Sequence, residues 1–241
     1  MLYKANLHSH TSEDAVEGFK INYCIFDLIN KVKDFDFKVL ALTGHEKFIY
    51  RESYGSYAKA RGILLIPGIE LKFRHWLFLS YHVLVLNCGR EINEVKNMQM
   101  LKAYKKNNPH VFIIAPHPNF GLMQSMGIKK LVSNINLFDA IEHSWYYSKR
   151  INKNNKASQI AKKFNKPFIA TSDIHNLKYL NTDYAMIESA DLDKESIFKA
   201  IKNNNFYNIS SDKKTFELFL YIILDRIKFF LLYPFIIKFK K

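Results

Sequence analysis

The sequence predicts an α/β fold in which parallel strands alternate with helices. Short apolar runs alternate with longer amphipathic stretches, a pattern that favours β/α units over a sandwich or a helical bundle. The 241 residues are enough for one barrel-sized domain, and 48% hydrophobic residues with 15% aromatics can fill a substantial core. This composition argues against intrinsic disorder.

Seven short apolar runs have the length and composition of buried strands. They span Tyr3–Leu7, Val39–Thr43, Ile63–Pro67, His82–Leu86, Val111–Ala115, Phe138–Glu142 and Phe168–Thr171. Three segments between them, Tyr23–Lys33, Glu91–Asn107 and Ile151–Asn165, have helical spacing and a polar face. We expect one domain over residues 1–212, because no repeat, Gly/Ser linker or low-complexity block interrupts it.

The tail, residues 213–241, is predicted to be an apolar, basic helix. Asp225, Arg226 and Lys228 lie inside its apolar stretch, so a membrane-spanning helix would bury charges at considerable cost. Its basic end and interleaved aromatics make peripheral membrane contact through residues 216–241 a possible role. Packing of the tail against the barrel or another subunit is the other interpretation, and we prefer it slightly over membrane contact.

Positive charge and few cysteines restrict the class of protein. Lys and Arg exceed Asp and Glu by 36 to 22, a net charge of +14 that could attract phosphorylated substrates, nucleic acid or anionic lipid. A genome-wide bias in composition explains the excess equally well. Cys24 and Cys88 lie far apart, which indicates neither a disulfide framework nor a thiolate zinc site. The N-terminus lacks the pattern of a signal peptide, so we expect a cytoplasmic protein.

Histidines and carboxylates cluster at the ends of the predicted strands. His8 and His10 follow the first strand, and residues i and i+2 of an extended segment project to the same side, so both imidazoles can reach one ion. Asp173 and His175 form a similar pair after the last strand. The other candidates, found near strands or in the adjoining loops, are Asp14, His45, Glu70, His82 and His117. In a β/α barrel such positions converge on one face.

Six histidines and three carboxylates exceed what one zinc ion can use, because a catalytic zinc takes three protein ligands and leaves a place for water. We therefore expect two or three divalent ions that share a bridging carboxylate. Zinc, manganese and iron all suit imidazole and carboxylate ligands, so the residues do not choose among them. Each motif alone is a weak signal, whereas their combined order is a strong one.

These motifs resemble the polymerase and histidinol phosphatase (PHP) superfamily of metal-dependent phosphoesterases. The similar segments are Leu7–Ser12, Leu42–His45, Pro67–Glu70, His82–Leu84, His117–Pro118 and Ser172–His175, and the resemblance covers residues 3 to about 190. It implies a distorted seven-stranded β/α barrel. It also implies a division of ligands: His8, His10, Glu70 and Asp173 on one ion; Glu70, His82 and His117 on a second; and Asp14, His45 and His175 on a third.

The resemblance implies hydrolysis of a phosphate ester by metal-activated hydroxide. Phosphomonoesters, nucleotide bisphosphates, other phosphorylated small molecules and short oligonucleotides are all compatible substrates. Asp173 or His175 is expected to transfer the proton of the leaving group. Glu46, His143 and Arg150 are expected to orient ligands or bind substrate, and the aromatic run that ends Trp145-Tyr146-Tyr147 suits a pocket wall that stacks a ring.

Gly44 departs from the family pattern, which usually has Asp before the histidine at position 45. A contact that orients His45 is then lost, or supplied by Glu46. This departure supports a rival interpretation, a non-catalytic metal-binding or membrane-tethered interaction protein with the same barrel. The complete set of nine ligand-type residues favours the enzyme instead.

Overall fold

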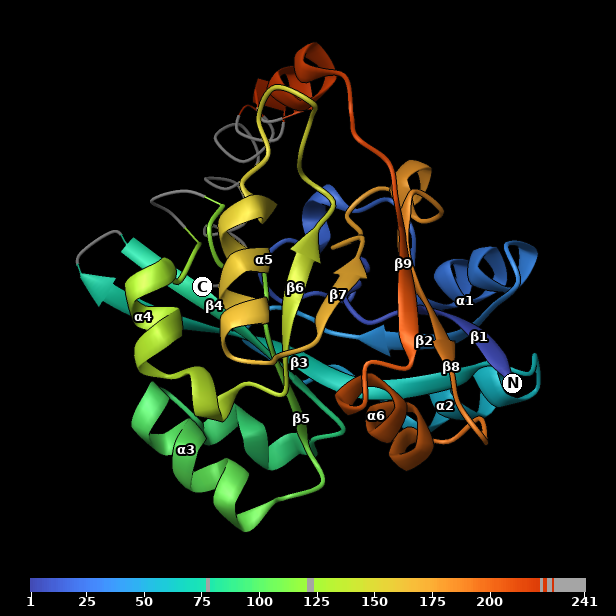
Figure 1. Ribbon diagram of the computed structural model, residues 1–241. Coiled ribbons are helices and arrows are strands. Elements are labelled where there is room, and N and C mark those ends of the chain that lie inside the picture. Colours follow the sequence, from blue (N-terminus) through green and yellow to red (C-terminus); the bar gives the residue numbers. More distant parts are fainter. Residues whose placement is uncertain (77–78, 121–123, 222, 225–226, 228–241) are drawn as a thin grey trace, which may run out of the picture.

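The computed structural model describes residues 1–241 except 77–78, 121–123, 222, 225–226 and 228–241. Its described strands form one sheet in the order β7-β6-β5-β4-β3-β2-β1-β8-β9, which curls into a nearly closed barrel (Figure 1). The strands are β1 (Leu2–Asn6), β2 (Phe37–Leu42), β3 (Leu64–Trp76), β4 (Leu79–Leu86), β5 (Phe112–Ala115), β6 (Ala140–Ser144), β7 (Phe168–Thr171), β8 (Asp183–Glu188) and β9 (Phe206–Ser210).

The α/β class is confirmed, but the expected number of seven strands is wrong. All seven predicted strands are present, and β8 and β9 are additional. Buried and partly exposed residues alternate along β8, and no residue of β9 is fully buried. Neither strand therefore contains the short, mostly apolar run by which the other strands were recognised.

The barrel is also not entirely parallel. β4 runs antiparallel to both β3 and β5, because β3 continues to Trp76 and returns as a hairpin instead of crossing over through a helix. The pairs β1–β2, β2–β3, β5–β6 and β6–β7 are parallel, as expected. β8 lies antiparallel to β1 at the other side of the sheet. The long β3–β4 hairpin carries side chains of the site described below.

A side chain links the two edges of the sheet. The amide of Asn208 on β9 donates a hydrogen bond from Nδ2 to the carbonyl oxygen of Phe168, and the backbone N–H of Ala170 donates to its Oδ1, each at 2.8 Å. Past the end of β7, the N–H of Ile174 donates to the carbonyl oxygen of His8, and the N–H of His10 donates to that of Ile174. The chain segments after β1 and β7 therefore lie side by side.

Helices cover the outside of the barrel in Figure 1: α1 (Ile25–Asp34), α2 (Glu52–Lys59), α3 (Met98–Asn107), α4 (Ile128–Ser133), α5 (Asn154–Lys163) and α6 (Lys194–Lys202). α1 buries Ile25, Leu28, Ile29 and Val32, which share one face at helical spacing. It begins later than predicted because the Asp27 carboxylate accepts the backbone N–H of Cys24 at 3.0 Å, which caps the first turn.

The barrel interior is apolar below the site. Inward-facing residues such as Val39, Ile66 and Ile114 join α6 in one hydrophobic cluster. There Phe198 of α6 stacks on Phe112 of β5, with ring centroids 4.6 Å apart. This packed interior holds the strand ends in place, so that residues following the strands are presented at the opposite opening.

The described part of the tail is helical at residues 215–221, 223–224 and 227, and it lies above the loop that follows β6 in Figure 1. Leu218 packs with Trp145 and Tyr179, whereas Phe216 and Phe219 are exposed. No helix among the described residues is long and apolar enough to cross a membrane. Predictions for residues 228–241 lie outside the described part, and the division at residues 212 and 213 stays a prediction.

Candidate metal centre

The ligand-type residues predicted from sequence lie together at one opening of the barrel. Four strands deliver most of them from the loops at their carboxyl ends: His8 and His10 after β1, His45 after β2, His117 after β5, and Asp173 and His175 after β7. Strands that run parallel end at the same edge, which explains why residues distant in sequence meet here. Asp14 joins them from the loop after β1.

Glu70 and His82 come from inside the β3–β4 hairpin rather than from strand ends. Glu70 is paired with Leu84, and His82 is two residues from Leu84 along β4, so the two side chains are diagonal neighbours on one face. His82 Nδ1 lies 2.7 Å from Glu70 Oε1. The expectation that Glu70 follows a strand end is therefore wrong, because β3 continues beyond it.

The Glu70 carboxylate lies at the centre of the cluster and is fully buried. Its Oε2 faces three imidazole Nε2 atoms, those of His8 at 3.2 Å, His10 at 3.3 Å and His45 at 3.0 Å. Its Oε1 faces two others, His82 Nδ1 at 2.7 Å and His117 Nε2 at 3.2 Å. The two oxygens thus face two different groups of imidazoles, as a carboxylate shared by two ions would.

Several atoms in this cluster are buried without a hydrogen-bond partner in the described part of the chain. They are both ring nitrogens of His8, Nε2 of His10 and His82, Nδ1 of His117, Oε2 of Glu70 and Oδ1 of Asp173. Asp173 Oδ1 lies 3.4 Å from His8 Nε2 and 3.3 Å from His10 Nε2, so these atoms face one another without hydrogen-bond geometry. Buried polar groups without partners are costly, and a divalent cation among them would satisfy several at once.

Three groups of described residues bring ligand atoms within 4.8 Å of one another. They are His8, His10, Glu70 and Asp173; His45, Glu70 and His82; and His10, His45 and His175. The first has the composition that the family resemblance implies. The second has His45 where the resemblance implies His117, although His117 Nε2 also faces Glu70. The donor set therefore fits a cluster of divalent ions.

Asp14 contacts the imidazoles from behind instead of joining any of these groups. Its Oδ2 lies 3.0 Å from His10 Nδ1 and 2.9 Å from His45 Nδ1, and it also accepts the backbone N–H of His45 at 2.8 Å. Such contacts turn the Nε2 atoms of both rings toward the centre of the cluster. Asp14, expected as a ligand, is thus arranged to orient two of them.

Gly44 replaces the aspartate that usually orients the following histidine in the family. In this chain Asp14, and not Glu46, contacts His45 in that way. Glu46 is exposed and its carboxylate lies 3.4 Å from Lys72 Nζ, so the expectation that it orients His45 is wrong. A Cβ atom on Gly44 would approach the Ile49 side chain to 2.7 Å. The absence of a side chain at position 44 therefore suits the local packing.

Two carboxylates that sequence reasoning did not select also contact the cluster. Glu142 on β6 is fully buried and accepts hydrogen bonds from Thr171 Oγ1 at 2.6 Å and from the backbone N–H of His117 at 2.8 Å. Its Oε2 lies 3.5 Å from His8 Nδ1. Glu142 could have been selected from the sequence, because it is a carboxylate within a mostly apolar predicted strand. The second carboxylate, Glu17, has its Oε2 3.3 Å from His175 Nε2. It follows no predicted strand, so the sequence did not indicate it.

The buried carboxylates and imidazoles of the cluster shift one another's pKa values. Burial opposes ionisation of Glu70, yet contacts with His82 and His8 hold the pKa of its carboxyl well below its usual value. Burial also opposes protonation of His8, but Asp173 and Glu70 outweigh it and raise the pKa of the imidazole to about 10. For His82, burial dominates and lowers the pKa. A cation that binds here would displace protons from imidazoles such as His8.

Two ligand candidates have strained backbones. The φ angles of His117 and Asp173 are 28° and 44°, in a region that residues other than glycine rarely adopt. Such strain costs of the order of 1–3 kcal/mol and is kept only where the surroundings enforce it. At His117 the hydrogen bond from the backbone N–H to Glu142 does so. In this conformation both side chains reach the cluster.

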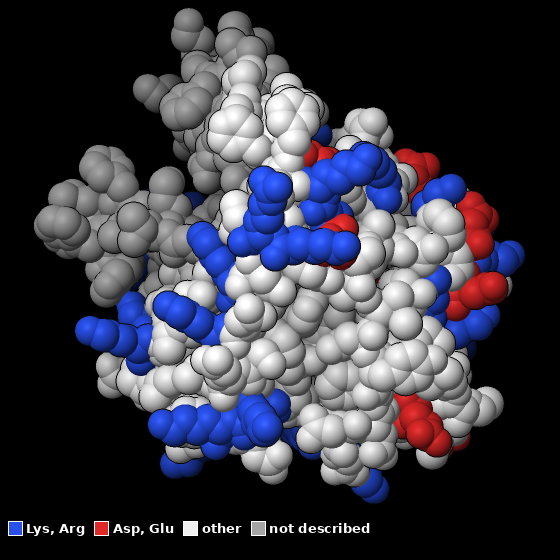
Figure 2. Space-filling view, turned by 45° about the horizontal axis from the view of Figure 1, so that its top comes forward, with Lys and Arg blue, Asp and Glu red and all other residues white. Residues whose placement is uncertain are grey.

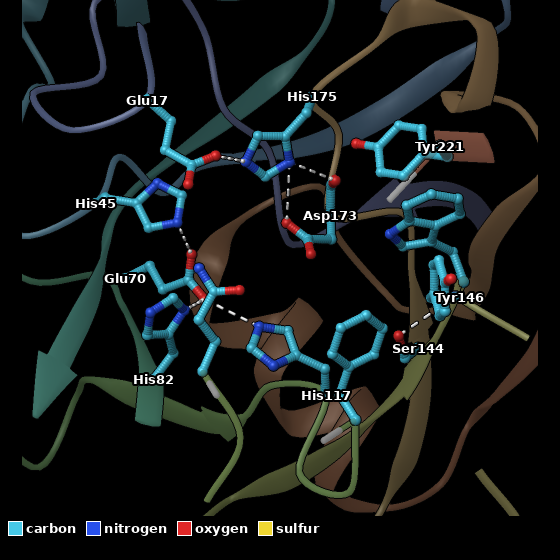
Figure 3. Close-up of a pocket in the computed structure, with 13 residues that line it drawn as sticks. Glu17, His45, Glu70, His82, His117, Ser144, Tyr146, Asp173, His175 and Tyr221 are labelled. Carbon is cyan, nitrogen blue, oxygen red and sulfur yellow. Dashed lines mark hydrogen bonds and ion pairs between the residues drawn. The ribbon is translucent and has the colours of Figure 1, made fainter. Parts of the chain in front are cut away.

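A cavity opens directly on the cluster (Figure 3). It is lined by Glu17, His45, Glu70, His82, His117, Phe120, Gln124, Ser144, Trp145, Tyr146, Asp173, His175 and Tyr221. No Lys or Arg is among these described lining residues, although Figure 2 shows such side chains spread over the surface. Positive charge in the cavity would therefore come from bound ions or, before ions bind, from protonated imidazoles such as His45, whose pKa the nearby carboxylates Glu70 and Asp14 raise to about 9 against the effect of burial.

Two residues expected to orient ligands or bind substrate lie elsewhere. His143 is not in the cavity lining, because it alternates with the inward-facing Glu142 on β6 and packs against Tyr147 and Phe168. Arg150 is exposed in the loop between β6 and α5 and does not line the cavity either. The expected aromatic wall does line it, through Trp145 and Tyr146.

Solved structures with this fold include PHP-like metal-dependent phosphoesterases. A two-domain protein from Bacteroides vulgatus ATCC 8482, which contains a predicted PHP-like metal-dependent phosphoesterase, aligns with a TM-score of 0.66 and 16% identity over 87% of this chain and 65% of that one. Endonuclease Q, in complex with a 27-mer duplex that has an abasic lesion at the active site, aligns with a TM-score of 0.62 and 16% identity over 88% and 60%.

PsfC from Pseudomonas syringae PB-5123 aligns with a TM-score of 0.58 and 13% identity over 94% of this chain and 97% of that one. This chain thus spans less than two thirds of the Bacteroides and Endonuclease Q chains, but almost all of PsfC. No curated protein matches it.

A family model described as PHP-associated matches residues 152–206, which include Asp173 and His175. Together with the fold, this match confirms the resemblance to the PHP superfamily that the histidine motifs indicated.

Proposed function

We infer that this chain, which resembles PHP-like metal-dependent phosphoesterases in motif and fold, is a metal-dependent hydrolase of phosphate esters. The observation that carries this proposal is the buried Glu70 carboxylate, whose two oxygens face two groups of imidazoles. A carboxylate placed in this way would hold two ions near each other, and a pair of ions is a common catalyst of phosphoester hydrolysis. Inactive relatives would be expected to lose such ligands, which argues against the non-catalytic alternative.

The distances support a first ion on His8, His10, Glu70 and Asp173. They support a second on Glu70 and His82, with His117 or His45 as a further ligand. His10, His45 and His175 are the residues for a third. Zinc, manganese and iron all suit these imidazole and carboxylate donors.

Bound ions would supply hydroxide near neutral pH and would polarise the phosphoryl oxygens. The chain's own groups then hold the ligands and move a proton. Asp173 Oδ1 faces His8 and His10, whereas His175 lies at the edge of the cavity with Nε2 near Glu17 Oε2. If two ions bind, a protonated His175 would donate its proton to the leaving oxygen, and Glu17 would keep the ring oriented. If a third ion binds, His175 would hold it instead.

The substrate class stays open within this proposal. The cavity has no Lys or Arg among its described lining residues, which favours a substrate with few phosphates outside the ions. Endonuclease Q was solved with a duplex substrate, which supports a nucleic acid as an alternative substrate here.

A cytoplasmic location and peripheral membrane contact through residues 216–241 also stay proposals. Co-sedimentation with anionic vesicles would test the latter, and no binding would contradict it.

The test combines metal analysis with hydrolysis assays. Purified protein is analysed for bound metal and assayed, with added manganese or zinc, on an aryl phosphomonoester, a phosphodiester, a nucleotide bisphosphate and a short oligonucleotide. Asp173→Ala removes a carboxylate from the cluster and should abolish hydrolysis. Asp191→Ala, which removes an exposed carboxylate outside the cluster, should leave it unchanged. Wild-type protein that binds metal and hydrolyses none of these esters would instead support the metal-binding role.

A further inference from the structure

The side of the cavity opposite the metal-ligand candidates is aromatic. Figure 3 shows Tyr146 and Tyr221 across the cavity from Glu17, His45 and His82. Phe120 and Trp145 complete this aromatic wall. Its four members come from three separate parts of the chain: the loop after β5, the loop after β6, and the C-terminal helix, for which residues 215–221 are described without a gap.

The rings of the aromatic wall contact one another edge to face. Ring centroids are 4.7 Å apart for Phe120 and Tyr146, 5.6 Å for Trp145 and Tyr146, and 5.2 Å for Trp145 and Tyr221, with interplanar angles between 72° and 88°. Edge-to-face packing fixes the rings without covering all of their faces. Trp145 is only 5% exposed and one of its faces stacks on Tyr179, with ring centroids 4.9 Å apart, so it supports the wall from behind. Phe120, Tyr146 and Tyr221 are partly exposed and can accept another flat ring from within the cavity.

Polar contacts hold the C-terminal helix against this wall. The Tyr146 hydroxyl donates to the carbonyl oxygen of Leu218 at 3.0 Å. Glu217 accepts hydrogen bonds from the Tyr179 hydroxyl at 3.0 Å and from Lys178 Nζ at 2.8 Å. Leu218 itself is 4% exposed. Tyr221, one helical turn further on, is thereby positioned at the cavity.

The metal-ligand side and the aromatic wall of the cavity suit different parts of one substrate, a phosphate group and a flat ring. The metal-ligand side offers imidazoles and carboxylates for ions that bind a phosphate, whereas the aromatic wall offers flat apolar surface. Among the described lining residues there is no Lys or Arg to bind a second phosphate group at the wall. A single phosphate joined to an aromatic group matches this division better than a polyphosphate or a purely aliphatic ester.

We propose that the C-terminal helix is part of the substrate site, and that Tyr221 and Tyr146, supported by Trp145, select phosphate esters that carry a nucleobase or similar ring, such as nucleoside monophosphates. This inference rests on the proposed function and names its substrate class. Stacking of one base on aromatic side chains corresponds to roughly a 5-fold to 150-fold preference in binding. Tyr221 is a specificity-determining residue in this scheme and takes no part in bond cleavage.

The first measurement compares two substrates on the full-length, metal-loaded chain. For each variant, kcat/KM is measured for adenosine 5′-monophosphate and for glycerol phosphate, which lacks a ring. Tyr221→Ala should lower the ratio of the two values roughly 10-fold, mainly through KM for the nucleotide, while Tyr221→Phe should keep it. Phe219→Ala is the matched control, because Phe219 belongs to the same helix but is 62% exposed. It should leave the ratio unchanged.

A second measurement reports binding without turnover. The chain has two tryptophans, so a Trp76→Phe background leaves Trp145 as its only tryptophan. A phosphonate analogue of adenosine 5′-monophosphate should change the Trp145 fluorescence of metal-loaded protein, and Tyr221→Ala should weaken this binding roughly 10-fold.

The outcomes separate this inference from the proposed function. Wild-type protein that hydrolyses glycerol phosphate but neither prefers nor binds the nucleotide would refute the inference and leave the function intact. Binding of the analogue that depends on Tyr221, in a protein that hydrolyses no ester, would refute the function and support the ring-binding site. An equal loss on both substrates in Tyr221→Ala would show that the residue is only structural.

Discussion

At the scale of single residues, Asp14 contacts two histidines of the metal centre, a role that its position in the sequence does not indicate. It stands beside a histidine motif, where a carboxylate is naturally read as a ligand. Its Oδ2 atom instead contacts Nδ1 of both His10 and His45 and accepts a backbone N–H. One buried carboxylate thus fixes the orientation of two rings, and it explains how His45 can be oriented without the aspartate that usually precedes it in the family.

Replacing Asp14 should therefore weaken metal binding without removing a ligand. We expect Asp14→Asn to lower the affinity for zinc or manganese by about 10-fold to 100-fold, the usual effect of removing a group that orients metal ligands. Isothermal titration calorimetry would measure it. Glu46→Gln is the matched control and should bind as wild type, because Glu46 faces Lys72. A larger loss in Glu46→Gln than in Asp14→Asn would overturn this assignment.

At the scale of elements, a buried ion pair fastens the start of the tail to the barrel. Lys213 Nζ lies 2.6 Å from Asp183 Oδ2 on β8, and the two side chains are 6% and 0% exposed. Thr182 and Ser210 also donate hydroxyl hydrogen bonds to Asp183, and the Lys213 backbone N–H donates to the carbonyl oxygen of Tyr147. The pair therefore connects β8, the tail and the loop that carries the aromatic wall.

Breaking this pair from one side should destabilise the fold. Lys213→Met keeps the apolar stem but leaves Asp183 buried and charged, so we expect a loss of about 3–5 kcal/mol in the free energy of unfolding. Urea denaturation would measure the loss, and adding Asp183→Asn to the same chain should restore part of it. Lys31→Met, at the exposed Lys31–Asp34 pair, should cost less than about 1 kcal/mol. Similar losses in the two single variants would contradict this account.

At the scale of the whole molecule, the Asn208 side chain contributes to closure of the barrel, together with the backbone hydrogen bonds between His8, His10 and Ile174. β7 and β9 lie at the two edges of the sheet, and the Asn208 amide provides both a donor and an acceptor to the backbone of β7. The side-chain amide thus makes the two hydrogen bonds to β7 that the backbone of a neighbouring strand would otherwise make. Because β7 leads directly to Asp173 and His175, this contact also helps to hold one side of the metal centre.

Asn208→Ala should leave backbone groups of β7 without their partner. We expect the free energy of unfolding to fall by about 1–3 kcal/mol and the amide hydrogen of Ala170 to exchange faster with solvent. Urea denaturation and hydrogen exchange followed by NMR would measure the two effects. Gln159→Ala, which removes an exposed amide side chain on α5, should change neither. Unaltered exchange at Ala170 in Asn208→Ala would show that the edges are held together by other contacts.

Much of this fold and site could be predicted because it is written in local patterns. Short, mostly apolar runs located the seven strands β1–β7, since strands buried on both faces are rich in apolar residues. The histidine pairs at positions 8 and 10 and the Asp173-Ile174-His175 segment indicated metal chemistry, because alternate residues of an extended chain point the same way. The aromatic run after β6 likewise predicted a wall of the cavity.

Tertiary structure alone decided which polar atoms meet. The β3–β4 register put His82 beside Glu70, and the fold of the loop after β1 turned Asp14 behind two rings and brought Glu17 to His175. The C-terminal helix became a cavity wall by packing on Trp145. Local sequence determines the period of burial and the types of side chain, whereas contacts between distant segments depend on strand register and loop path, which no local pattern encodes.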